Sequence, residues 1–227
     1  MKPYQMISIQ DCGEGLVPIP TEMFAFETPH PYQKLGAPYG EVSPYLLREG
    51  VLEALKRSQK QLELRRPGWR LKIFDAYRPI AVQQFMVDYT FQILRKRWVN
   101  ASKSEIEQQV AQFWAQPSNN PDTPPPHSTG AAIDLTLVNE KQETLDLGGE
   151  IDEISARSHP NFYQNATIAS EQGYHQRREL LKEVMFSANF CQHPEEWWHF
   201  SLGDQMWVWL NSQKCLSSPL IADYGRI

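Results

Sequence analysis

Cysteine is scarce in this sequence. The 227 residues contain 3 cysteines, Cys12, Cys191 and Cys215, and no two of them lie close together in the chain. A disulfide framework and a cysteine-rich zinc cluster both need several cysteines at short spacings. The sequence therefore excludes both, and we expect nitrogen and oxygen ligands if the chain binds a metal ion.

Long apolar runs and an excess of basic residues are also absent. No stretch approaches the roughly 20 apolar residues that span a bilayer, and the first residues, MKPYQ, lack the apolar segment of a secretory signal. We therefore expect a cytoplasmic protein without a membrane span. The 22 Lys and Arg residues are outnumbered by 27 Asp and Glu residues, for a formal net charge of -5. This balance argues against binding of nucleic acid through bulk charge and favours a small or neutral partner.

The sequence does contain enough apolar material for a folded core. Hydrophobic residues make up 41% of the chain and charged residues 22%, which is typical of a globular protein. The 17 prolines and 7 tryptophans are spread among ordinary apolar residues and are not gathered in biased tracts. A chain of this length suffices for one domain with a sizeable core, so we predict a single domain over residues 1–227.

Hydrophobic periodicity predicts a mixture of helices and short strands. Apolar residues at helical spacing predict helices over residues 45–64, 80–98, 104–116 and 176–190. Alternating or short apolar segments predict strands over residues 70–75, 131–137, 197–202 and 206–210. Ser104 and Glu107 have the spacing of a capping box for the third helix. The proline-rich segment 117–126 is expected to be an irregular loop, and residues 139–144 to turn a hairpin.

Three residues have settings that suit metal ligands: His127, Asp134 and His199. Gly130 lies between the first two, so a turn at the glycine can bring the imidazole back over the polar face of the strand that carries Asp134. Strand alternation allows His199 to face the same cavity. Two neutral imidazoles and one carboxylate, with a fourth position left for water, suit a catalytic zinc ion.

Glu196 is the candidate base for a water molecule activated by such a metal ion. It lies three residues before His199, close enough in sequence to reach the open side of the ion. In a fully extended strand, this odd separation would place the two side chains on opposite faces. We therefore expect a bend, or the start of the strand, between Glu196 and His199.

Each of these residues also has a purely structural interpretation. A histidine beside aromatic residues is more often a packing residue than a ligand, and an aspartate can simply cap a turn. The position of Asp134 between Ile133 and Leu135 weakens that alternative, because a carboxylate is costly to desolvate without a partner. Asp75 and Arg78 could form a local turn ion pair or part of a site. The remaining histidines are interpreted as surface or packing residues: His30, His159, His175 and His193.

Four ordered motifs resemble those of the VanX-type D-alanyl-D-alanine dipeptidases. HSTGAAID, from His127 to Asp134, resembles the HxxGxAxD signature, and EWWH, from Glu196 to His199, resembles the ExxH signature. DAYRP, which begins at Asp75, is similar to the family's D-G/A-Y-R-P segment. GGEID followed by RSH, within residues 148–159, resembles its G-x-x-x-D…R-S-H loop. The four motifs together are far more specific than an isolated HxxGxAxD.

The resemblance implies that the three candidate ligands hold one zinc ion per chain and that Glu196 is the catalytic base, in agreement with the chemistry above. It further implies that Arg78 stabilises the oxyanion and that Asp152 meets the free amino terminus of the substrate. The implied fold is the α+β zinc D,D-peptidase (hedgehog/D,D-peptidase-like) fold, with helices packed against a small antiparallel sheet. The implied activity is hydrolysis of D-alanyl-D-alanine or a similar free dipeptide derived from peptidoglycan.

One position departs from the family pattern. The family commonly has serine two residues before the first zinc histidine, where this chain has Pro125. Proline offers neither a side-chain donor nor a backbone N–H, so substrate preference can differ from D-alanyl-D-alanine. Two other functions stay open: a zinc D,D- or L,D-carboxypeptidase acting on longer peptidoglycan peptides, and a non-catalytic zinc-binding module. Asp152 favours a dipeptidase over the first, and the joint presence of Glu196 and Arg78 argues against the second.

Overall fold

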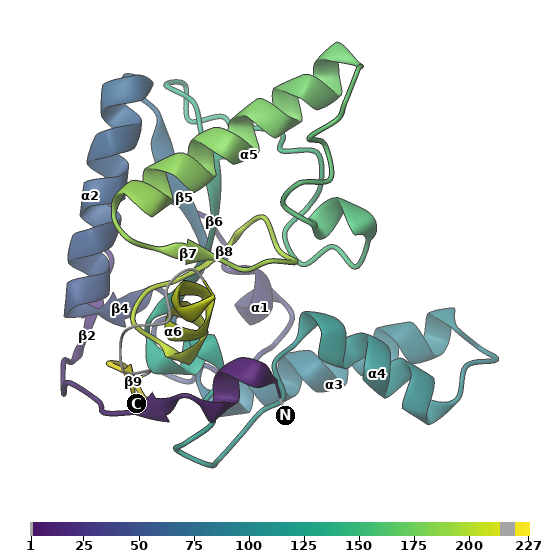
Figure 1. Cartoon of the computed structure of the whole chain (residues 1–227). Helices are drawn as coiled ribbons and strands as arrows, with labels where there is room; N and C mark the ends of the chain where they lie inside the picture. Colours follow the sequence, from purple (N-terminus) through teal and green to yellow (C-terminus); the bar gives the residue numbers. More distant parts are fainter. Residues whose placement is uncertain (1, 214–220) are drawn as a thin grey trace.

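Five strands form the central sheet of the computed structural model, which describes residues 2–213 and 221–227 and so leaves out Cys215. The strand order is β3-β5-β6-β8-β7 (Figure 1). β3 pairs with β5 in parallel, and the other three pairs are antiparallel. The strands are β3 (Ala25–Phe26), β5 (Arg70–Asp75), β6 (Ala132–Val138), β7 (Cys191–Gln192) and β8 (His199–Ser201). This largely antiparallel sheet, combined with helices, confirms the predicted α+β class.

Two long helices cover one face of the sheet. α2 (Glu49–Arg65) and α5 (Ala169–Ser187) pack against each other over it (Figure 1). The packing follows from the alternation of side chains along β6. Ile133, Leu135 and Leu137 point to the same face and are fully buried in one hydrophobic cluster with leucines of both helices. The alternate positions of β6 face the opposite side of the sheet, where the polar site lies.

A helical hairpin contains a second hydrophobic cluster. α3 (Ile80–Arg97) and α4 (Lys103–Phe113) pack against each other and project from the sheet on the right of Figure 1. Their buried residues share this cluster with Tyr32 of the short helix α1 (Pro31–Lys34) and with Trp114. Packing against the hairpin thereby holds the rings of Tyr32 and Trp114 at the edge of the polar face.

The remaining segments frame the sheet. β2 (Leu16–Pro18) pairs antiparallel with β4 (Leu46–Arg48), and β1 (Ser8–Ile9) pairs in parallel with β9 (Ile221–Ala222). Helix α6 and the first 3-10 helix, η1, contact each other. These last helical segments are α6 (Gln205–Ser212), η1 (Pro3–Met6), η2 (Pro126–Thr129) and η3 (Ala156–Ser158).

Most predicted elements are present, although several boundaries differ. The helix predicted over residues 45–64 begins only at Glu49, because residues 46–48 pair with β2 as strand β4. The helix predicted over 176–190 begins earlier, at Ala169, and ends at Ser187. The predicted hairpin over 139–144 is present, with Val138 and Thr144 forming a bridge across it.

The predicted capping box of α4 is wrong by two residues. Ser102, and not Ser104, caps the helix: its Oγ accepts a hydrogen bond from the backbone N–H of Glu105 at 3.2 Å. Glu105 Oε2 accepts in return from the backbone N–H of Ser102 at 2.7 Å. Both serines satisfy the same spacing rule, because Glu105 and Glu107 follow them by three residues, and only the backbone path distinguishes them.

The strand predicted over residues 206–210 is wrong, because these residues form helix α6. Asp204 caps the helix, with Oδ1 accepting from the backbone N–H of Trp207 at 2.8 Å. A short apolar run fits either a strand or a buried helix, and the capping aspartate is the local signal that favours the helix.

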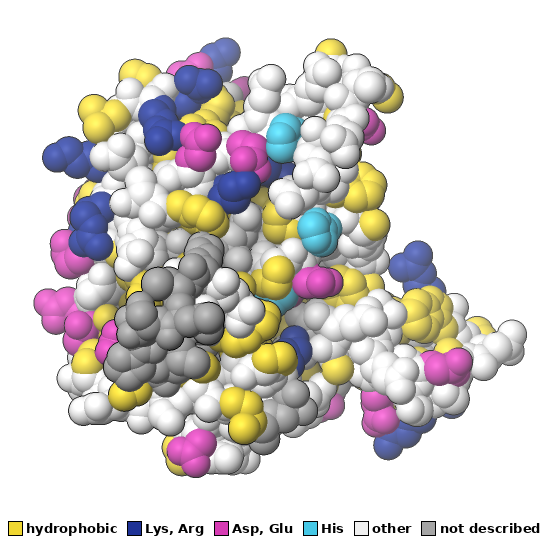
Figure 2. Space-filling model, viewed as in Figure 1, with side chains coloured by type: hydrophobic (Ala, Val, Ile, Leu, Met, Phe, Trp, Pro, Cys, Tyr) yellow, Lys and Arg dark blue, Asp and Glu magenta, His cyan; other side chains and the backbone are white. Residues whose placement is uncertain are grey.

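The surface is mixed in charge on the face that Figure 2 shows, where basic and acidic side chains are interspersed over α2 and α5. Within the described part of the chain, no helix combines the length and the apolar character needed to cross a membrane.

Candidate metal centre and its cavity

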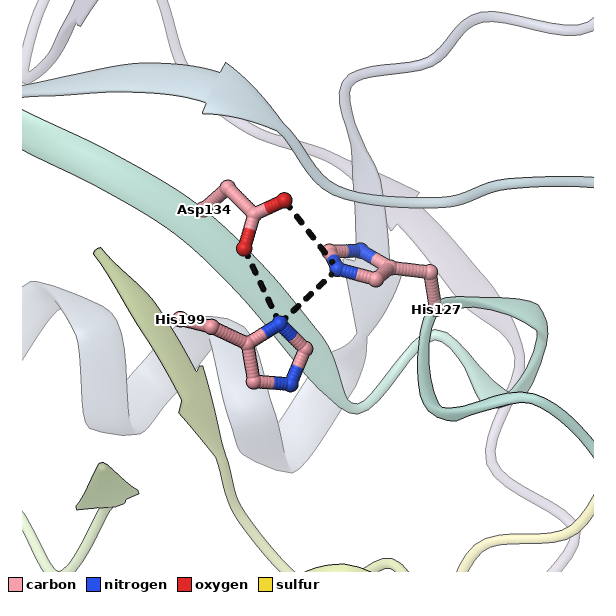
Figure 3. Close-up of side chains that lie close together, drawn as sticks. All are labelled: His127, Asp134 and His199. Atoms are coloured by element: carbon pink, nitrogen blue, oxygen red, sulfur yellow. Dashed lines mark hydrogen bonds and ion pairs between the residues drawn. The ribbon is translucent and has the colours of Figure 1, made fainter. Parts of the chain in front are cut away.

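The three candidate metal ligands lie together in a buried cluster (Figure 3). His127 Nε2 lies 3.1 Å from His199 Nδ1, and these nitrogens lie 3.3 and 2.9 Å, respectively, from the two carboxylate oxygens of Asp134. One ligand atom from each residue lies within 4.8 Å of the other two. The fold therefore brings two distant segments of the chain to one point.

The register of the sheet positions two of the three side chains. Asp134 of β6 and His199 of β8 are direct partners in the antiparallel pairing, and Asp75 of β5 is the partner of Asp134 on its other side. Directly opposed residues present their side chains on the same face of a sheet. β8 begins at His199, which supplies the strand start expected after Glu196.

A glycine turn brings His127 to this row. His127 belongs to η2, whose C-cap is Gly130 in the left-handed conformation, with φ of 72°. A Cβ atom at Gly130 would lie 2.5 Å from Leu16 Cδ2, so Leu16 would have to shift, and the left-handed backbone conformation itself favours glycine here. The chain reverses at this glycine and enters β6 at Ala132.

A backbone hydrogen bond fixes the tautomer of His127. Its Nδ1 lies 2.7 Å from the carbonyl oxygen of Ala76. Because a carbonyl oxygen only accepts, Nδ1 carries the proton and Nε2 directs a free lone pair toward Asp134 and His199. Histidines that bind metal ions usually donate their second nitrogen in this way.

The protonation states of the other two residues also suit a cation. Burial lowers the pKa of His199 below its usual value, although the hydrogen bond to Asp134 opposes the shift. Burial alone would raise the pKa of Asp134, but the charge and hydrogen bonds of His127 and His199 lower it well below its usual range. A neutral imidazole and an ionised carboxylate are the forms that bind a divalent metal. The donor set therefore fits a zinc-type ion with a free fourth position.

Arg78 reaches the same cavity from the turn after β5. Its guanidinium carbon lies 5.0 Å from the ring centre of Tyr32 and 4.9 Å from that of Trp114. Nε and Nη2 donate to Asp75 Oδ2 at 3.0 and 2.7 Å, and Nη2 lies 3.5 Å from Asp134 Oδ2. The turn ion pair is thus present, and the same guanidinium faces the cluster of candidate ligands.

Asp75 orients Arg78. Its carboxylate is fully buried, accepts a hydrogen bond from the Tyr39 hydroxyl at 3.1 Å, and lies 3.0 Å from His30 Nε2. Burial raises the pKa of Asp75, but the charge of Arg78 and the contact with His30 more than offset this and lower it. Asp75 is therefore ionised and held from several sides, one of them by His30, which the sequence indicated only as a surface or packing residue.

Glu196 lies beside the cluster, and its carboxylate has no ion-pair contact shorter than 4.0 Å to residues 2–213 and 221–227. Its Oε2 is 4.0 Å from His199 Nδ1, and its Oε1 is 4.0 Å from His193 Nδ1. Burial, reinforced by the charges of Asp134 and Asp152, raises the pKa of Glu196 well above its usual value. A gap of this length is readily bridged by one water molecule.

Asp152 lines the cavity and contacts Tyr32. The Tyr32 hydroxyl donates to Asp152 Oδ2 at 2.7 Å and accepts from Arg78 Nη2 at 3.2 Å. Burial and the nearby charge of Asp134 raise the pKa of Asp152 to about 7. Its backbone φ is 64°, a left-handed conformation that aspartate adopts more readily than most residues.

Backbone contacts fasten the loop that carries Asp152. Arg178 donates from Nε to the carbonyl oxygen of Leu147 at 2.7 Å. The backbone N–H of Trp197 donates to the carbonyl oxygen of Ser158 at 2.9 Å. The second contact joins the RSH segment to the EWWH segment and so holds the Asp152 loop beside Glu196 and His199.

Several cavity residues carry no sequence signal. The cavity that contains the candidate ligands is also lined by Lys2, Tyr4, Gln83, Trp114 and His193. His193, interpreted from sequence as a surface or packing residue, lines the cavity beside Glu196. Lys2 and Tyr4 reach the cavity only through the packing of segments that are remote in sequence, whereas Gln83 and His193 lie within five residues of Arg78 and Glu196, respectively.

The α+β fold and a buried His–Asp–His cluster with an adjacent carboxylate and arginine are together typical of metallopeptidases. The family model described as D-ala-D-ala dipeptidase matches residues 26–217. The chain is 50% identical over 240 residues to a D-alanyl-D-alanine dipeptidase of Synechocystis sp., covering 100% of this chain and 97% of that protein. It is 30% identical over 178 residues to a D-alanyl-D-alanine dipeptidase of Escherichia coli, covering 78% of this chain and 72% of that protein.

Among solved structures, the LdcB LD-carboxypeptidase aligns with 94% of this chain and 85% of that chain, at 14% identity and a TM-score of 0.49. The two sequence relatives and the family match establish the family of this chain. This chain belongs to the D-alanyl-D-alanine dipeptidase family and is a metallopeptidase. The matched range includes every candidate site residue predicted from sequence, whereas Lys2 and Tyr4 lie outside it.

Proposed function

We propose that this chain is a zinc-dependent dipeptidase that hydrolyses D-alanyl-D-alanine or a similar free dipeptide. The observation that carries the proposal is the buried His127–Asp134–His199 cluster with Glu196 at 4.0 Å. The names of the relatives support the choice of D-alanyl-D-alanine as the first substrate to test.

Zinc is the metal proposed for the cluster. His127 Nε2, His199 Nδ1 and one oxygen of Asp134 would hold it, because two nitrogens and one oxygen suit a tetrahedral catalytic site with one open position. When bound, zinc would polarise the scissile carbonyl and lower the pKa of the attacking water.

Glu196 is proposed to move the proton. Its carboxylate would take a proton from the attacking water and donate it to the nitrogen of the departing amino acid. The raised pKa of Glu196 favours the first step, because a carboxylate that binds a proton more tightly is the stronger base. Its distance from His199 leaves space for the water on which it would act.

Arg78 is proposed to face the oxygen that becomes negative as the tetrahedral species forms. Its guanidinium is held by Asp75 and by two aromatic rings, so little reorganisation is needed during the reaction. Removal of one preorganised donor of this kind typically costs about 3 to 4 kcal/mol of barrier.

Asp152 is proposed to bind the ammonium group of the substrate. The carboxylate lies in the same cavity as the metal cluster, and an ion pair there would select substrates with a free amino terminus. This role favours free dipeptides over longer peptidoglycan peptides. Cleavage of D-alanyl-D-alanine compared with its N-acetyl derivative would separate a dipeptidase from a carboxypeptidase, since the latter accepts both.

The central test is a Glu196→Gln variant assayed with stoichiometric zinc. We expect kcat to fall roughly 10²- to 10⁴-fold while zinc content stays at one ion per chain. Glu195→Gln is the matched control, because Glu195 is exposed and adjacent in sequence. Hydrolysis by Glu196→Gln at the parental rate would refute the base assignment, and zinc binding without hydrolysis by the parent of any D,D or L,D dipeptide would favour a non-catalytic module.

A further inference from the structure

The segment that precedes β1 forms one wall of the cavity. Lys2 and Tyr4 line the cavity together with Glu196 and His193. Tyr4 is buried, and the segment from Pro3 folds as the short helix η1. A part of the chain far from all four motifs therefore contributes directly to the surface that a substrate would meet.

Several contacts hold this segment in place. Gln205 Nε2 donates to the carbonyl oxygens of Ile7 and Asp122, at 2.6 and 2.9 Å. Ile7 packs in a small hydrophobic cluster with Val208 of α6. The backbone N–H of Lys2 donates to a side-chain oxygen within η1 at 2.9 Å. The position of Lys2 is thus determined by packing against α6 and by the hydrogen bonds of its own turn.

The Lys2 ammonium group has no ion-pair partner within the described ranges 2–213 and 221–227. The charges that act on it most strongly are those of Glu196 and Glu195, which raise its pKa, while burial lowers the pKa overall. A partly buried ammonium group that lines a cavity and has no carboxylate partner among the described residues is available to a ligand that carries an anion.

A free dipeptide brings two charged ends to this cavity. The proposed function assigns the ammonium end to Asp152, whose carboxylate accepts a hydrogen bond from Tyr32. Lys2 lies instead under the influence of the charges of Glu196 and Glu195. Arg78 is already engaged by Asp75, Gln83 and Tyr32. The nearby wall made by Pro125 and Pro126 offers no backbone N–H donor. Among the described residues lining the cavity, Lys2 is the remaining lysine or arginine that could bind a carboxylate.

We propose that the Lys2 ammonium group binds the C-terminal carboxylate of the substrate and that the segment before β1 thereby sets part of the specificity for free dipeptides. This inference rests on the proposed dipeptidase function. It makes Lys2 a substrate-binding residue supplied from outside the region that the family model matches.

The test compares Lys2→Met with Lys2→Arg in the full chain loaded with zinc, using D-alanyl-D-alanine and its C-terminal amide. For the free dipeptide, we expect Lys2→Met to raise KM about tenfold or more with kcat nearly unchanged, because one charge-assisted contact is lost. Lys2→Arg keeps the charge, so its KM should stay within a few fold of the parental value. For the amide, which has no carboxylate, Lys2→Met and the parent should have the same kcat/KM. Lys60→Met, at an exposed position on α2, is the matched control.

Three outcomes would overturn the inference. In the first, Lys2→Met leaves KM for the free dipeptide unchanged. In the second, Lys2→Met lowers kcat/KM by the same factor for the dipeptide and for the amide. In the third, it lowers kcat and shifts the pH profile, which would mean that Lys2 acts on Glu196 instead. Failure of the parent to hydrolyse any dipeptide would instead remove the proposed function, and the inference with it.

Discussion

The Tyr32 hydroxyl donates a hydrogen bond of 2.7 Å to Asp152 and at the same time accepts one from Arg78. One phenol group therefore couples the residue proposed to bind the substrate's ammonium group to the residue proposed to stabilise the oxyanion. The ring of Tyr32 also stacks on the Arg78 guanidinium, so the contact fixes both partners.

Tyr32→Phe tests this coupling. The variant keeps the ring and its packing but leaves Asp152 without its donor, and a hydrogen bond to a charged group contributes about 1.5 to 3 kcal/mol. We expect KM for D-alanyl-D-alanine to rise roughly tenfold, with zinc content unchanged. Tyr89→Phe on α3 is the control. Steady-state kinetics equal to those of the parent would show that the contact has no role in substrate binding.

Asp152→Asn tests the cost of keeping a carboxylate in this cavity. The pKa of Asp152 is raised from 3.8 to about 7, so the folded protein holds a proton that the unfolded chain loses between these values. Stability is therefore lost as pH rises from about 4 to 7, by an amount on the order of 4 kcal/mol. Asparagine tolerates the left-handed backbone here and has no charge to desolvate.

We accordingly expect metal-free Asp152→Asn to be more stable than the metal-free parent at pH 8 and to approach the parent near pH 4. Denaturant unfolding after chelation, at several pH values, measures the difference. A stability difference that does not change with pH would contradict the raised pKa.

Gly130→Ala tests the turn that delivers His127. The substitution places a Cβ atom 2.5 Å from Leu16 Cδ2 and forces alanine to adopt φ of 72°. We expect a loss of roughly 2 to 4 kcal/mol in unfolding free energy together with weaker zinc binding. Gly15→Ala is the matched control, because a Cβ atom there meets nothing within 4 Å. Equal stability of the two variants would show that the turn relaxes without cost.

Metal addition should stabilise the folded chain only through the intact cluster. A ligand that binds the folded state at 100 times its Kd adds about 2.7 kcal/mol to the unfolding free energy. We therefore expect zinc to raise the Tm of the chelated parent by several degrees and to leave that of His199→Ala nearly unchanged. His159→Ala, at an exposed histidine, is the control. A zinc-dependent Tm in His199→Ala would place the ion elsewhere.

Local chemistry made much of the candidate site predictable. His127, Gly130 and Asp134 lie within eight consecutive residues, so the turn and the strand that orient them are short-range features. Glu196 and His199 are similarly close, and the predicted strand start between them follows from side-chain alternation alone. Local patterns placed Arg78 in a turn and the family resemblance implied its catalytic role, but its stacking partners, which come from α1 and the end of α4, could not be predicted.

The errors occurred where local rules allow two outcomes. Residues 206–210 fit a strand or a helix, and two serines fit the capping box of α4. Lys2 and Tyr4 could not be identified at all, because their place in the cavity depends on contacts between segments separated by most of the chain. His193 lies only three residues before Glu196, but is interpreted from sequence as a surface or packing residue.

The sequence by itself determined which chemical groups are present and how each is oriented within its own strand or turn, since those depend on side-chain alternation, glycine and proline. The tertiary structure alone decided which of these groups face one another. The pairing of β6 with both β5 and β8 sets Asp75, Asp134 and His199 in one row, and the packing of η1 on α6 adds Lys2 to the cavity. Such convergence depends on burial of apolar surface between remote segments, which no local pattern encodes.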